Sequence, residues 1–78
     1  MNSFQKLLDF LGELKQRKIH FTLEHNRDET IMVMIAVPGE RWEVEFFANC
    51  SVEVEVFRSV NGVVGEEELE RLFRDFSD

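Results

Sequence analysis

The sequence predicts an α+β domain in which a four-stranded antiparallel β-meander carries an N-terminal and a C-terminal helix on one face, in the order αββββα. Two observations predict this fold. Residues 41–46 and 51–56 alternate apolar and charged side chains, which is typical of a β-hairpin, and both ends of the chain show apolar residues at helical spacing. At 78 residues, the chain is expected to form one domain, residues 1–78.

An amphipathic helix is predicted from Ser3 to about Arg17 or Lys18. Its apolar side chains recur at helical spacing at Phe4, Leu7, Leu8, Leu11 and Leu14. Asn2 and Gln5 have the spacing of a capping box at the start of the helix, and the basic residues near its end complement the helix dipole.

The next two strands differ in the number of apolar faces. Residues 19–24 alternate apolar and polar and predict a strand almost directly after the helix, whereas residues 30–37 are apolar on both faces, as in an interior strand.

Two loop lengths are open at the Pro38-Gly39 turn. A loop of two residues places odd-numbered side chains in the core, and a loop of three places even-numbered ones there. The two sets are Ile31, Val33 and Ile35 or Met32, Met34 and Ala36.

The hairpin separates a core face from an acidic face, because strand side chains alternate. The core face is Trp42, Val44, Phe46, Val52, Val54 and Val56, and the acidic face is Glu43, Glu45, Glu53 and Glu55. A three-residue loop, Asn49-Cys50-Ser51, is predicted because a two-residue loop would mix the two faces. This register pairs Phe46 with Val54 and places Glu45 directly opposite Glu55.

A connection that contains Asn61-Gly62 and Gly65 leads to a second predicted helix, residues 66–76. Its apolar stripe is Leu69, Leu72, Phe73 and Phe76, and acidic residues open its first turn. Both helices are expected to cover the apolar face of the sheet and to bury Trp42.

The outer face of the sheet is expected to be more apolar than is usual for a monomer. Phe47 and Phe57 lie among its glutamates, beside one apolar face of the strand at residues 30–37. An exposed patch of that extent predicts a partner. A homodimer through the outer face or through an edge strand is therefore weighed against a monomer.

Charge and composition exclude several classes of protein. A net charge of −7 argues against binding to nucleic acid or to an anionic membrane, because both need a basic patch. A hydrophobic content of 44% excludes a disordered chain. The single cysteine, Cys50, is expected to be an inert thiol in a reducing cytoplasm, and residues 1–10 lack a secretory signal, so a cytoplasmic protein is predicted.

The residue types that carry catalysis or bind metals do not converge in the sequence. His20 and His25 are five residues apart on one predicted strand and point to opposite faces. A flat row of glutamates does not wrap around a hard cation, and the serines have no histidine at a suggestive spacing. We therefore expect no catalytic residues, no metal and no cofactor, and the protein is predicted not to be an enzyme.

The segment of residues 38–47, Pro-Gly-Glu-Arg-Trp-Glu-Val-Glu-Phe-Phe, resembles small bacterial cytosolic proteins without a characterised activity, and the size and acidity resemble those of toxin-immunity proteins. The predicted function is a non-enzymatic binding module that contacts a basic protein. Its predicted contact residues are Glu43, Glu45, Phe47, Glu53, Glu55 and Phe57. The alternatives are an immunity protein that neutralises a basic toxin and a homodimeric structural or adaptor domain without a small-molecule ligand.

Overall fold

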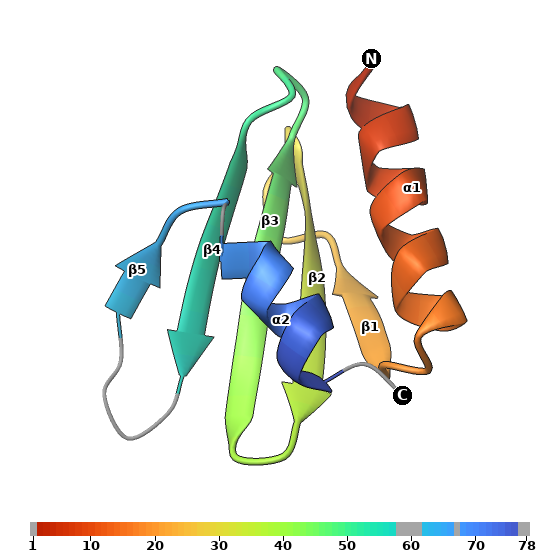
Figure 1. Cartoon of the computed structure of the whole chain (residues 1–78). Coiled ribbons are helices and arrows are strands. Elements are labelled where there is room, and N and C mark those ends of the chain that lie inside the picture. The colour runs from red at the N-terminus through yellow and green to blue at the C-terminus, as the bar shows by residue number, and fades with distance from the viewer. Residues whose placement is uncertain (1, 58–61, 67, 77–78) are drawn as a thin grey trace.

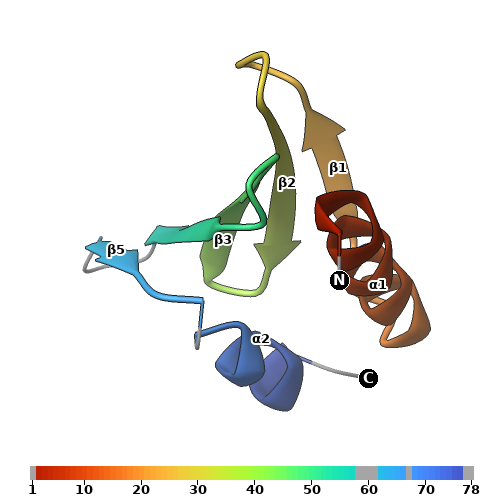
Figure 2. The same cartoon turned by 90° about the horizontal axis from the view of Figure 1, so that it is seen from above.

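The protein folds as one open antiparallel sheet with both helices on the same face (Figures 1 and 2). The computed structural model describes residues 2–57, 62–66 and 68–76. In chain order the elements are α1 (Ser3–Gln16), β1 (Phe21–Glu24), β2 (Thr30–Val37), β3 (Glu40–Phe47), β4 (Val52–Phe57), β5 (Gly62–Val64) and α2 (Glu68–Phe76). The predicted α+β class, with a helix at each end of an antiparallel meander, is confirmed.

Helix α1 begins and ends with local hydrogen bonds. The side chain of Asn2 accepts a hydrogen bond from the backbone N–H of Gln5 at 2.6 Å, at the predicted capping position. At the other end, Lys18 adopts a left-handed φ of 61°, and the N–H of Ile19 donates to the carbonyl of Leu14 at 2.9 Å. This Schellman-type ending turns the chain abruptly, so β1 begins two residues later than predicted.

The turn between β2 and β3 has two residues, Pro38 and Gly39, because Val37 pairs with Glu40. Gly39 has a φ of 80°, which suits the third position of a type II turn with proline before it. Of the two loop lengths left open by the sequence, the shorter one is therefore observed. The odd-numbered side chains of β2 face the helices, and Met32 and Met34 face away from them.

The register of the β3–β4 hairpin differs from the prediction by two residues. The structure pairs Phe46 with Val52 and Glu45 with Glu53, where Val54 and Glu55 were predicted. The loop still has three residues but lies one position earlier, because Cys50 adopts a left-handed φ of 74° and the N–H of Phe47 bonds the carbonyl of Ser51 at 2.9 Å. A shift of two residues preserves the faces of a strand, so the predicted core and acidic sides are correct.

The hydrophobic core lies between the sheet and the helices. Its buried side chains are Leu7, Phe10, Leu14, Ile19, Val33, Ile35, Trp42, Val44, Phe46, Val54, Val56 and Leu72. The ring of Phe10 lies 5.2 Å from that of Phe46 and 5.7 Å from that of Phe73, measured between centroids. These three rings join α1, β3 and α2. Trp42 is completely buried, as predicted.

Helix α2 is attached to the sheet by a polar cluster around Trp42. The indole N–H of Trp42 donates to Glu40 Oε1 at 3.0 Å, and Arg71 Nη2 donates to the same oxygen at 3.1 Å. The guanidinium of Arg71 also lies 5.0 Å from the centroid of the indole ring and donates to Glu68 at 3.2 Å. The contacts of Arg71 with Glu40 and Trp42 therefore join α2 to β3.

A fifth strand, β5, pairs antiparallel with the edge of β4, in a segment that the sequence analysis assigned to a connection. The three residues of β5 are too few for an alternating pattern to be recognised in the sequence. Because β5 covers β4, the open edges of the sheet belong to β5 and to β1.

Candidate functional site

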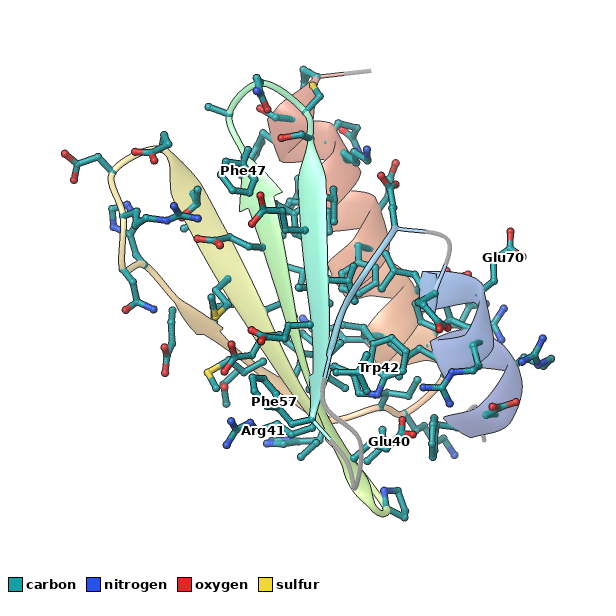
Figure 3. All side chains as sticks on the ribbon, turned by 90° about the vertical axis from the view of Figure 1, so that its left-hand side faces the viewer. Glu40, Arg41, Trp42, Phe47, Phe57 and Glu70 are labelled. Atoms are coloured by element: carbon teal, nitrogen blue, oxygen red, sulfur yellow. The ribbon has the colours of Figure 1, made fainter. Side chains whose placement is uncertain are left out.

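The outer face of the sheet, opposite the helices, carries all six residues predicted to bind a partner. They are Glu43, Glu45, Phe47, Glu53, Glu55 and Phe57. Figure 3 shows Phe57 beside Arg41 near one end of this face and Phe47 near the other, while Trp42 points to the opposite side of the sheet. The structure therefore brings the predicted residues together on one surface, which we call the outer face.

Four carboxylates stand in two directly opposed pairs on the outer face. Glu43 lies across from Glu55, and Glu45 lies across from Glu53. Directly opposed like charges weaken a strand pair by up to about 1 kcal/mol where they remain charged and solvated. The two pairs differ in how the structure offsets this repulsion.

Glu45 is bound within the protein. Its carboxylate accepts hydrogen bonds from Arg27 at 2.7 and 3.1 Å, one to each oxygen, and from the hydroxyl of Thr30 at 2.8 Å. The guanidinium of Arg27 is the main reason that the pKa of Glu45 lies below its ordinary value, and the Thr30 hydroxyl acts in the same direction while burial opposes both. Glu45 is only 8% exposed, so this residue has a structural role on the outer face.

The two aromatic rings of the outer face are each covered by an arginine. Arg27 lies 5.2 Å from the centroid of Phe47, and Arg41 lies 4.5 Å from the centroid of Phe57. Both rings are half-buried. The apolar patch is consequently smaller than the sequence predicts, because arginine stems and guanidinium groups cover part of it.

Three carboxylates of the outer face remain open to a partner: Glu43, Glu53 and Glu55. Within the described part of the chain, neither Glu53 nor Glu55 has an ion-pair or hydrogen-bond partner, and Glu43 approaches Arg41 at 3.8 Å. The acidic side chains line a shallow hollow of about 70 Å³ together with Met32 and Val54. The outer face is thus an anionic surface beside the side chain of Met32, because the side chain of Val54 points to the core and is buried.

The candidate metal ligands stay apart. His20 and His25 flank β1 instead of lying within it, and both are exposed. Across residues 2–57, 62–66 and 68–76, no three histidine, cysteine or carboxylate side chains gather in a way that could hold a metal ion. Among these residues, too, no helix is long and apolar enough to cross a membrane.

Sequence reasoning missed Arg27 and Thr30, which organise the outer face around Glu45. Arg27 lies in a polar turn 18 residues before Glu45, so sequence distance hides the contact. A usable signal existed in the Pro38-Gly39 turn. A two-residue loop there pairs Met32 with Glu45 and Thr30 with Phe47, which brings the start of β2 beside these outer-face residues.

Comparisons with protein-family models, with curated proteins and with solved structures found no match. The resemblance of residues 38–47 to small bacterial proteins therefore stays a prediction.

Proposed function

We propose that this protein is a non-enzymatic binding module whose outer face contacts a positively charged protein. The observation that carries the proposal is the pairing of Glu43 with Glu55 on a sheet face that neither helix covers. An opposed pair of carboxylates lowers the stability of an isolated domain. A guanidinium or ammonium group from a partner would remove that repulsion, so the arrangement suits binding better than folding.

The rigidity of the sheet supports this function. Glu43, Glu53 and Glu55 are held on neighbouring strands and need little ordering when a partner arrives, which lowers the entropic cost of association. Their summed charge attracts a basic surface and raises the association rate, more so at low salt. Phe47 and Phe57 provide aromatic surface of the kind enriched in interfaces.

The four carboxylates among the predicted contact residues differ in their pairing within the protein. Glu53, Glu55 and Glu43 present free or weakly paired carboxylates, whereas Glu45 positions Arg27 over Phe47. A substitution of Glu45 would disturb this packing, so a test of binding is cleaner when it leaves Glu45 unchanged.

The test compares two double variants with the same change in net charge. Glu53→Lys/Glu55→Lys reverses charge on the outer face, and Asp9→Lys/Glu70→Lys does so at exposed positions of α1 and α2, on the other side of the sheet (Figure 3). Each variant and the wild type is immobilised and exposed to lysate of the source cells. Affinities of each retained protein are then measured at several salt concentrations, and far-UV circular dichroism checks folding.

The outer-face variant is expected to lose a basic partner that the helix-face variant keeps. The affinity of that partner for the wild type should fall steeply with salt. If both variants bind the same proteins with the same salt dependence, the outer face is a solubilising surface and the proposal is wrong.

A further inference from the structure

The exposed large apolar side chains of the described residues are Phe4, Leu8 and Leu23, at 66%, 43% and 50% exposure. Two of them belong to one flank of α1, which continues through Leu11 at helical spacing. The opposite flank faces α2, because Arg17 at the end of α1 lies 5.1 Å from the ring centroid of Phe73 in α2. The apolar flank of α1 therefore points toward β1, where Leu23 lies.

The strand beside this flank is an open edge of the sheet. Backbone N–H and C=O groups of one strand residue point to the same side and alternate along the strand. The carbonyl of Glu29 accepts from Ala48 at 2.9 Å, so odd-numbered residues at this end of β2 bond toward β3 and even-numbered ones toward β1. Thr22 pairs with Met34 and thus bonds inward. Phe21 and Leu23 consequently direct their backbone groups to the open edge.

From these observations we infer that β1 pairs antiparallel with β1 of a second copy of this chain, about a two-fold axis that passes through Thr22. In this register the backbone groups of Phe21 meet those of Leu23 of the second copy, so that the open groups of both edges are satisfied. The same register places the imidazole of His20 opposite the carboxylate of Glu24 and stacks apolar Phe21 on apolar Leu23. The edge is self-complementary in hydrogen bonding and apolar contact.

The two-fold axis also brings the two α1 helices together. It stands perpendicular to the sheet, so both copies keep their helices on the same side, and the flank of Phe4, Leu8 and Leu11 meets its own copy in antiparallel orientation. In this arrangement the second copy covers Leu23, and the flanks of the two α1 helices face each other across the axis. Because each copy carries a net charge of −7, their mutual repulsion is screened by salt, and the dimer should strengthen as salt rises.

The register is tested by disulfide trapping. Across the proposed axis the two Thr22 residues form a non-hydrogen-bonded pair with Cα atoms about 4.5 Å apart, within disulfide range. Thr22→Cys in a Cys50→Gly background should form a disulfide-linked dimer with oxidised glutathione. Glu24→Cys in the same background is the matched control, because its two copies would be about 13 Å apart along the strands. Equal trapping of both variants, or of neither, overturns the register.

Association without a cross-link is tested by sedimentation equilibrium from the 9.2 kDa monomer. Leu8→Glu adds charge to the apolar flank and should raise the dissociation constant about tenfold or more, whereas Gln16→Glu adds the same charge at an exposed position outside that flank and should leave it nearly unchanged. A wild type that stays monomeric at high salt and high concentration refutes the inference. Because salt strengthens this contact and weakens that of a basic partner, the failure of one proposal does not imply the failure of the other.

Discussion

Replacement of Trp42 by alanine is expected to remove a large part of the stability of this fold. Trp42 is completely buried on β3, donates its indole N–H to Glu40 at 3.0 Å and lies beneath the guanidinium of Arg71. A tryptophan-to-alanine change in a packed core costs about 3 to 5 kcal/mol. A chain of 78 residues has a total stability of about 4 to 12 kcal/mol. The substitution should therefore remove at least about a quarter of the free energy of unfolding, and all of it if the wild type lies at the low end of this range.

Trp42→Phe separates the polar contribution from the volume of the side chain. It removes the hydrogen bond to Glu40, worth about 1 kcal/mol, and leaves a smaller cavity than alanine does. Glu40 keeps its hydrogen bond from Arg71 at 3.1 Å, so no buried acceptor is orphaned. For Trp42→Phe we expect the free energy of unfolding to fall by about 2 kcal/mol, which is less than for Trp42→Ala.

Urea unfolding followed by far-UV circular dichroism measures both variants, because tryptophan fluorescence disappears with the residue. In the wild type, acrylamide should quench the fluorescence of Trp42 only weakly. A Trp42→Ala variant within about 1 kcal/mol of the wild type, or a freely quenched Trp42, would show that the packing between β3 and α2 is wrong.

Three further predictions concern the outer face and its turn. The pKa of Glu45 is lowered in the folded protein, so its carboxylate stabilises the fold at a pH above the pKa of an unfolded glutamate, about 4.3. This stabilisation is lost as the pH falls through the folded pKa. Urea unfolding across pH 6 to 3 should therefore show a smaller acid-dependent loss of unfolding free energy for Glu45→Gln than for the wild type. Cys50→Gly should raise the free energy of unfolding by about 0.5 to 1 kcal/mol, because glycine adopts the observed φ of 74° without strain. An unchanged urea midpoint would contradict the left-handed conformation of Cys50. Glu55→Thr should also raise the free energy of unfolding, by up to about 1 kcal/mol, because it removes the charge opposite Glu43. A lower urea midpoint than that of the wild type would show that this pair is not repulsive in the free protein.

The faces of the strands could be predicted from the sequence because their period of two is robust. The predicted loop at residues 49–51 and the observed one at residues 48–50 give the same faces, so the alternation alone could not choose between them. The choice rests on the left-handed conformation of Cys50, which residue preferences do not favour. The alternating pattern thus predicts the faces of the strands but not the register of the hairpin.

The polar interactions of the candidate site were less predictable than its position. The pattern placed Glu45 on the outer face correctly, but its pairing with Arg27 depends on a turn that folds back across β2 and β3. The coverage of Phe47 by the same arginine depends on that turn as well. A long side chain that crosses neighbouring strands leaves no periodic pattern in the sequence. Its effect on the solvent exposure of the residues it covers, such as Phe47, is therefore seen only in the structure.

The two proposed contacts influence each other through charge. A two-fold axis perpendicular to the sheet places the outer faces of both copies on the same side, so the dimer has twice the negative charge over a continuous acidic surface. This repulsion opposes association of the copies, and a basic partner that neutralises Glu53 and Glu55 would reduce it. By linkage, a dimer must then bind that partner more tightly than a monomer does, by the same factor. The opposed carboxylates would in this way connect partner binding to assembly, a role for which a stability cost in the free chain is physically reasonable.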